Sequence, residues 1–219
     1  ISTIYASKLD GLIISGANPS KPDMTEEPFW APLVEVMDWA MENTNSILCS
    51  CLATHALLKY YINIDRELRG QKSWGVFPHT VANSPNPLIA GLDDSFMGLH
   101  SHFYDLPLKK IQDTDLEVLA YNSQAGFFLA STTDTKLVLY QGHPEYDAIS
   151  LLKEYQREIT NFLSGLRPDY PPLPENYFSK AAIPVLENFQ KKVLLTKEQS
   201  NFPEARLSEL VKVEWRHPG

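Results

Sequence analysis

The sequence predicts an α/β protein, a sandwich around a mostly parallel sheet with helices on both faces. Short apolar runs bounded by turn residues alternate with segments whose apolar residues recur every three or four positions. Alternation of strands with helices is typical of a parallel sheet. The chain of 219 residues, 43% of them hydrophobic, is long enough for one sizeable domain with a buried site.

The chain begins with a strand, a glycine turn and a helix. Residues 10–15 (DGLIIS) form an apolar run that fits a buried parallel strand, and the run ends in a tight turn at Gly16 and Ala17. Residues 18–28 are polar and rich in proline, which predicts a loop. From Pro28 to Met41 apolar residues recur at helical spacing and give one apolar face.

A second strand then runs directly into a cysteine and a helix. Residues 46–50 (SILCS) are typical of a short strand, Cys51 follows, and residues 52–61 resume a helical pattern. A strand that turns sharply into a helix exposes the residue at the turn, as at a nucleophile elbow.

The second half of the chain is expected to contain further strands and one long helix. The expected strands are residues 72–82, 116–121, 126–131 and 137–141. The expected helix covers residues 147–165, with Gly165 as its C-cap. A proline-rich connector (168–174) follows, and then weak helical patterns at 184–195 and 203–213.

Composition limits the classes of partner. A net charge of -8 without a basic run argues against nucleic acid, and no apolar run approaches the roughly 20 residues that span a bilayer. The two cysteines, Cys49 and Cys51, are too close in a strand for an unstrained disulfide. With no signal peptide visible, a reducing cytoplasm is the expected location.

Cys51 is the candidate nucleophile, because a helix N-terminus and a neighbouring imidazolium both favour the reactive thiolate form of a cysteine. The backbone N–H of Leu52 would then face the space in which an oxyanion forms, and the turn at Ala17 could supply a second donor. The alternative is that Cys51 is only a small core residue. Cys49, inside the strand, is expected to be structural.

A histidine and a glutamate follow the last expected strand. In Gln141-Gly142-His143-Pro144-Glu145, the histidine can act as a base toward a thiol while the glutamate fixes its tautomer and orientation. A polar loop before a helix is the alternative. The order of glycine turn, cysteine elbow and His-Pro-Glu favours the catalytic interpretation.

Four segments in this order resemble the homoserine O-succinyltransferase family: DGLIISGA, SILCSCLATHALL, GLDDSFMGLHSHFYDLP and GHPEYDAISLLKEYQRE. The resemblance covers Asp10 to about Phe178. It implies the class I glutamine amidotransferase-like (flavodoxin-like) fold, with a domain at 1–178 whose N-terminal strand or strands lie outside this chain. It also implies a divergent C-terminal extension at 179–219 packed on that domain.

The resemblance implies acyl transfer from succinyl-CoA or acetyl-CoA to the hydroxyl of L-homoserine, by a ping-pong route in methionine-type biosynthesis. Cys51 would carry the acyl group, with His143 as base and Glu145 as its orienting acid. Lys72, Ser101 and Arg157 match the family's substrate-binding positions, and Ser20 matches the position that governs acyl choice. We further expect acyl-CoA as a substrate without a bound cofactor, no metal, small-molecule partners and a possible homodimer.

Two departures from the family pattern leave the acceptor and the activity open. His102 follows Ser101 where the family tends to have arginine, and Trp215-Arg216-His217 is at best a remnant of the family's C-terminal motif. Serine or another hydroxy amino acid could therefore replace homoserine as the acceptor. The cysteine elbow and the His-Pro-Glu segment also fit an amidotransferase-like hydrolase, and a catalytically silent subunit could keep the same fold.

Overall fold

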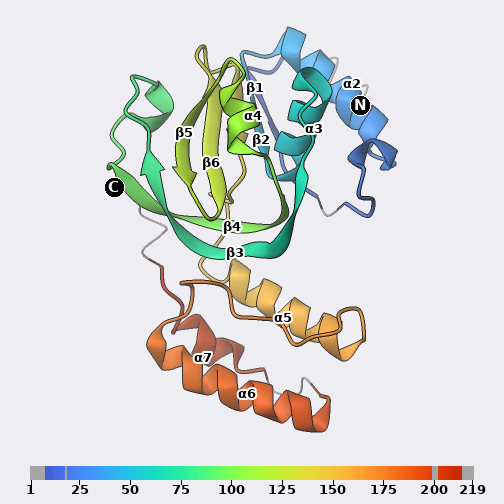
Figure 1. The fold of residues 1–219 in the computed structure, drawn as a ribbon, viewed down its shortest axis with the longest axis vertical. Coiled ribbons are helices and arrows are strands. Elements are labelled where there is room, and N and C mark those ends of the chain that lie inside the picture. Colours follow the sequence, from blue (N-terminus) through green and yellow to red (C-terminus); the bar gives the residue numbers. More distant parts are fainter. Residues whose placement is uncertain (1–7, 18, 199–201, 214–219) are drawn as a thin grey trace.

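The computed structural model describes residues 8–17, 19–198 and 202–213, so Trp215, Arg216 and His217 lie outside it (Figure 1). The strands are β1 (Gly11–Ile14), β2 (Ser46–Ser50), β3 (Glu67–Val81), β4 (Ser95–Asp105), β5 (Leu116–Asn122), β6 (Gly126–Thr132) and β7 (Leu137–Tyr140). The helices are α2 (Trp30–Asn43), α3 (Leu52–Ile62), α4 (Leu108–Gln112), α5 (Ser150–Leu163), α6 (Ile183–Thr196) and α7 (Glu204–Ser208), and the 3-10 helices are η1 (Met24–Glu26), η2 (Pro87–Ile89) and η3 (Lys180–Ala182).

The α/β class is confirmed, and the seven strands form one sheet in the order β1-β2-β7-β6-β5-β3-β4. Parallel pairing joins β1, β2 and β7, the strands that carry the glycine turn, the cysteine and the histidine. The pairs from β7 through β6, β5 and β3 to β4 are antiparallel. The expected parallel pairing is therefore limited to β1, β2 and β7, the part of the sheet that positions the loops with the glycine turn, the cysteine and the histidine.

The two faces of the sheet are covered differently. One face buries a cluster that includes Met37 of α2, Leu57 of α3 and Ile111 of α4. On the other face, Phe128 and Val138 pack with residues of the β3–β4 connection, including Ile89. The second face of the central strands is thus covered by a long connection with a 3-10 helix, where the sequence predicted α-helices.

β1 is an edge strand, which differs from the expected buried strand. Ile13 is 73% exposed, and only β2 pairs with β1. No described strand pairs with the outer edge of β1.

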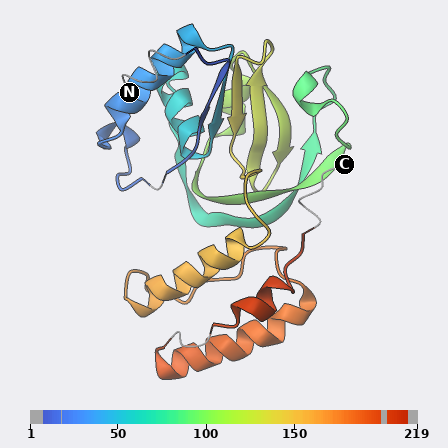
Figure 2. The same cartoon turned by 180° about the vertical axis from the view of Figure 1, so that it is seen from behind.

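The curved ribbon of β3 and β4 lies between the other strands of the sheet and the three C-terminal helices α5, α6 and α7 (Figures 1 and 2). Trp74 and Val76 of β3 pack there against Tyr155 of α5, Leu186 of α6 and Leu207 of α7. The backbone of Glu175, in the extended segment before α6, also pairs with β3 at Gly75. Gly75 has a φ of +145°, and any Cβ there would collide with the backbone of Glu175, so this close approach requires glycine. No helix in these described segments is long and apolar enough to cross a membrane.

Candidate active site

Cys51 lies at a strained turn between β2 and α3. Its φ of 52° and ψ of -113° are rarely adopted by a residue with a side chain. The Cys51 N–H donates to the carbonyl of Tyr140 at 2.8 Å, which fixes the turn against the end of β7. The Cys51 side chain is partly exposed, whereas Cys49 is fully buried and burial raises its pKa to about 12. The geometry therefore distinguishes a partly accessible thiol at position 51 from a fully buried one at position 49.

The glycine turn after β1 lies directly against this elbow. A Cβ built on Gly16 would be 3.1 Å from the Cβ of Cys51 and 3.2 Å from the backbone nitrogen of Leu52. Glycine thus allows the two loops to approach closely. Ala17 and Leu52, the two expected oxyanion donors, line the same cavity as Cys51.

His143 is held by its backbone and by Glu145. Its N–H donates to the carbonyl of Leu99 at 2.9 Å, and its ring stacks on Tyr146 at 4.3 Å between centroids. Nδ1 lies 2.8 Å from Oε1 of Glu145, so an Nδ1–H would donate to the carboxylate and leave Nε2 for the thiol. Nε2 is buried and makes no hydrogen bond of ordinary geometry with a described residue.

The site favours the charged form of His143. Burial lowers its pKa, but interactions with the Cys51 thiol and with Glu145 outweigh burial and raise the pKa to about 9. Burial raises the pKa of the Glu145 carboxyl, but the hydrogen bond with His143, the charge of His143 and further hydrogen bonds together hold this pKa below its usual value. Together these groups can form a thiolate–imidazolium–carboxylate arrangement.

We expect His143 to titrate near pH 9, and its pKa to fall in Cys51→Ala and in Glu145→Gln, because each change removes an interaction that favours the imidazolium. Since the folded pKa lies above the unfolded value of about 6.5, the stabilisation from this charge is complete below that value and is lost as pH rises toward 9. NMR titration of histidine labelled with ¹⁵N measures each pKa. An unchanged pKa in both variants would contradict the arrangement.

A cavity of about 680 Å³ contains the expected catalytic and substrate-binding residues except Ser20. It is formed by the β1 and β2 loops, β3, β4 and α5, so it lies between the sheet and the C-terminal helices. Its polar lining includes Cys51, His143, Glu145, Lys72, Ser101, Arg157, Glu154, Arg66, His55 and His102.

Glu154 is the central residue of this cavity that the sequence analysis missed. The residue is 7% exposed, and its Oε2 accepts hydrogen bonds from Lys72 at 3.1 Å and Ser101 at 2.6 Å. Trp74 Nε1 also donates to Oε2 at 2.9 Å, and Tyr146 donates to Oε1 at 2.6 Å. Although burial raises the pKa of Glu154, the Lys72 charge and these hydrogen bonds hold it below its usual value.

The three expected substrate-binding residues differ in how firmly they are held. Lys72 and Ser101 are both bound to Glu154, and burial lowers the pKa of Lys72 against the opposing effect of that carboxylate. Arg157, one turn further along α5, has a side chain 55% exposed and only a long contact of 3.9 Å with Glu158. Lys72 and Ser101 are therefore preorganised, while Arg157 is free to turn toward a ligand.

Ser20 lies in the loop beside the cavity but does not line it. Its backbone N–H and hydroxyl donate to the carboxylate of Glu27, which also accepts from the Lys21 N–H at 2.6 Å. Glu27 is buried, so these hydrogen bonds fix the loop to the body of the protein. Pro19, the neighbouring residue, reaches the cavity wall.

Four other described histidines are buried and favour the neutral form. Their hydrogen bonds run from His79 to His100 (2.9 Å), from His100 to His102 (2.9 Å) and from His102 to the Tyr104 carbonyl (2.7 Å), while His55 pairs with Gln141. Burial lowers the pKa of His102 to about 3 and that of His55 to about 4. Among the imidazoles described, His143 is therefore the one that accepts a proton at neutral pH.

Within the described residues, no group of three or more histidine, cysteine or acidic side chains is arranged to hold a metal ion.

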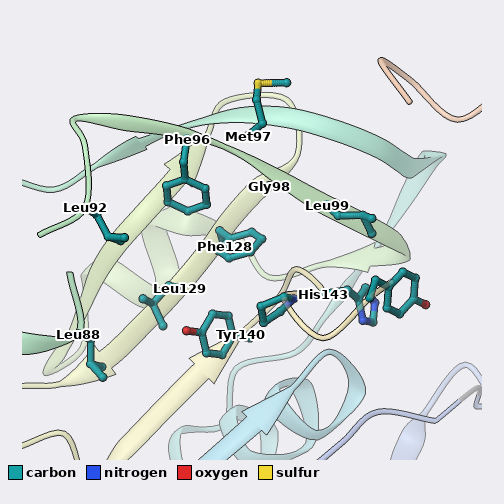
Figure 3. A pocket seen from close by; sticks show the side chains of 12 residues that line it. Leu88, Leu92, Phe96, Met97, Gly98, Leu99, Phe128, Leu129, Tyr140 and His143 are labelled. Atoms are coloured by element: carbon teal, nitrogen blue, oxygen red, sulfur yellow. The ribbon is translucent and has the colours of Figure 1, made fainter. Parts of the chain in front are cut away.

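A second cavity, of about 290 Å³, adjoins the His143 loop on its other side (Figure 3). Its wall is mostly apolar and includes Phe96, Leu99, Phe128 and Tyr140. Gly142 is required there, because any Cβ at this position would collide with the Phe128 ring. This packing fixes the loop that carries His143.

The fold and site together define a protein of the class I glutamine amidotransferase-like fold with a Cys-His-Glu site. A glutamine amidotransferase from Thermotoga maritima has a similar backbone, with a TM-score of 0.51 at 16% identity over 84% of this chain and 77% of that chain. The glutaminase domain of Trypanosoma brucei CTPS has a TM-score of 0.50 at 11% identity, over 67% and 66% of the two chains. At these identities the similarity concerns the fold alone.

The chain belongs to the homoserine O-succinyltransferase family, whose model matches residues 1–219, so the family resemblance is confirmed. It is 44% identical to the homoserine O-succinyltransferase of Nitrosococcus oceani over 97% of this chain and 59% of that protein. It is 48% identical to the corresponding protein of Thioalkalivibrio nitratireducens over 87% and 54% of the two chains. The chain thus spans between half and three fifths of the length of these relatives.

Proposed function

We propose that this protein is a homoserine O-acyltransferase that moves a succinyl group from succinyl-CoA to L-homoserine through an acyl-Cys51 intermediate. The observation that carries the proposal is a partly exposed cysteine at a strained elbow beside the His143–Glu145 pair. Family membership and the printed name of the relatives support the reaction class and favour succinyl over acetyl as the donor group.

The first half-reaction loads the enzyme. The Cys51 thiolate attacks the thioester carbonyl carbon of the acyl-CoA, and the oxyanion accepts hydrogen bonds from the backbone N–H groups of Leu52 and Ala17. The carbon–sulfur bond to CoA then breaks. The leaving CoA thiolate takes the proton of the His143 imidazolium, which leaves a neutral base beside acyl-Cys51.

The second half-reaction transfers the acyl group. Neutral His143 Nε2 takes the proton of the homoserine hydroxyl as its oxygen attacks the acyl carbonyl carbon. The tetrahedral intermediate collapses, the bond to Cys51 breaks, and the thiolate–imidazolium pair is restored. Glu145 holds Nδ1–H throughout, so His143 gives and takes its proton at one nitrogen.

Lys72, Ser101 and Arg157 are assigned to the amino-acid acceptor. An acceptor such as homoserine carries an ammonium and a carboxylate, which need opposite partners. Arg157 can hold the carboxylate with its guanidinium. Glu154, with Lys72 and Ser101 fixed on it, supplies the negative charge and the hydrogen-bonding groups near the ammonium.

The test is intact mass after mixing the protein, at its full natural length, with succinyl-CoA or acetyl-CoA. One succinyl adduct is expected in the natural sequence, and none in Cys51→Ala. Cys49→Ala is the matched control, because this fully buried thiol should not affect the adduct. Adding L-homoserine should discharge the adduct and yield the O-acyl ester.

Three different results would point to three different functions. Discharge by L-serine in preference to L-homoserine would move the acceptor to serine. Ammonia release from glutamine without any acyl adduct would indicate an amidotransferase-like hydrolase. Absence of both reactions would indicate a catalytically silent subunit and overturn the proposal.

A further inference from the structure

The geometry points to Arg66 as the residue that binds the distal carboxylate of a dicarboxylic acyl group carried on Cys51. The inference rests on the proposed acyl-Cys51 intermediate and adds a subsite to it. Arg66 lies in the connector between α3 and β3 and lines the same cavity as Cys51.

The guanidinium of Arg66 is held in place through one of its nitrogens and one of its faces. Nη2 donates to the carbonyls of Lys21 at 3.1 Å and Pro22 at 2.9 Å. The guanidinium carbon lies 3.9 Å from the centre of the Tyr104 ring, so the cation stacks on that aromatic face. These contacts fix the orientation without neutralising the charge.

Arg66 forms no ion pair with any carboxylate in the described part of the chain. Asp23 and Glu27 act on it only from a distance, and burial lowers its pKa more strongly than any of these charges raises it. Glu27 is already engaged by Ser20 and Lys21. A partly buried guanidinium without a carboxylate partner, at the wall of an active-site cavity, favours an anionic ligand.

The other two cations of the cavity have acidic neighbours. Lys72 is paired with Glu154 at 3.1 Å, and Arg157 lies beside Glu158. Both are on the side of the cavity formed by β3 and α5, whereas Arg66 is tied to the loop that follows β1. A reaction that joins a dicarboxylic acyl group to an amino acid brings two carboxylates to the site. Arg157 on one side and Arg66 on the other provide a guanidinium for each.

Arg66 also connects the loop that carries Ser20 to the cavity. Its bonds to Lys21 and Pro22 hold the segment that follows Ser20, and Glu27 holds the same segment from the other side. Arg66 would bind the end of a longer acyl chain that reaches from Cys51 toward this loop. An acetyl group has no carboxylate and gains nothing from this guanidinium.

The experiment compares three donors: succinyl-CoA, its terminal amide succinamoyl-CoA, and acetyl-CoA. The rate of Cys51 acylation is measured by quenched-flow intact mass for the natural sequence and for Arg66→Gln. In the natural sequence succinyl should acylate Cys51 roughly 10- to 100-fold faster than its neutral amide, the range expected for a charged hydrogen-bonded contact. In Arg66→Gln this ratio should approach one, while acylation by acetyl-CoA changes little.

Arg69→Gln is the matched control. Arg69 is three residues away, pairs with Asp105 and does not line the cavity, so its replacement should leave the succinyl-to-amide ratio unchanged. Arg66→Lys, which keeps the charge without the planar fork, should retain part of the ratio. The inference is overturned if Arg66→Gln keeps the ratio of the natural sequence, or if it slows all three donors equally. If the natural sequence forms no adduct with any donor, the proposed function itself has failed and the inference falls with it.

Discussion

Replacing His143 by asparagine will slow the formation of acyl-Cys51 by roughly 10²- to 10⁴-fold, the range that a positioned proton-transfer group contributes. In the proposed mechanism the imidazolium of His143 stabilises the thiolate and protonates the leaving CoA, and the variant loses both effects. No other described histidine can replace it, because His55 and His102, which share the cavity, are buried and neutral. Release of CoA in a single turnover, followed with a thiol reagent, measures the rate.

Glu145→Gln is a milder change at the same site, and its acylation rate is compared with that of His143→Asn. The amide oxygen can still accept the Nδ1–H of His143 and keep the ring oriented, so only the charge is lost, and the rate should fall less than in His143→Asn. Thermal unfolding of both variants shows whether the fold is retained. If folded His143→Asn acylates at the natural rate, His143 is not the proton-transfer group.

The catalytic loops could be predicted from the sequence because each depends on local chemistry. Cys51 follows five strand residues and precedes a helix, so the elbow is visible within about fifteen positions. The Gly16 turn and the His-Pro-Glu segment also end short apolar runs. Since β1, β2 and β7 are parallel neighbours, their carboxyl ends meet at one edge, and the three loops come together there.

The pairing of the remaining strands could not be predicted in the same way. β3 begins at Glu67 and runs for 15 residues, five residues ahead of the expected start, and β4 is absent from the expected strands. β4 contains Gly98 and the polar run of His100, Ser101 and His102, and its strand conformation depends on the long antiparallel pairing with β3. Tertiary pairing of this kind leaves little trace in local composition.

Glu154 and Arg66 were missed for a related reason. Both lie in sequences rich in charged residues, where a charge normally faces solvent. Glu154 is buried because the β3–β4 ribbon curves over α5 and brings Lys72, Trp74 and Ser101 onto one carboxylate. A prediction of this site needs the curvature of the sheet, which is a property of the whole fold.

Glu154→Leu should lower the free energy of unfolding by about 3–5 kcal/mol, the usual cost of removing one partner from a buried ion pair. It leaves the Lys72 ammonium, with its side chain 16% exposed, without its carboxylate, and removes the acceptor of Trp74, Ser101 and Tyr146. Because the folded pKa of Glu154 is depressed, the stabilisation that is lost exists above its unfolded pKa and disappears as pH falls through the folded value. The difference between the natural sequence and the variant in urea should therefore shrink in acid.

A double variant separates the structural role of this pair from its role in the site. Lys72→Met combined with Glu154→Leu removes both charges, so most of the lost stability should return, since well-packed apolar residues replace buried ion pairs at little cost. Acyl transfer to homoserine should stay low, because the acceptor side of the cavity has lost two of its charged groups, Lys72 and Glu154. Glu158→Leu is the control one turn along α5. Its loss of stability should be smaller, because the Glu158 carboxylate is more exposed and pairs with Arg167 at 2.9 Å. Recovery of full transfer activity in the double variant would show that this pair supports the fold alone, and the acceptor would then have to be held by Arg157 and its neighbours.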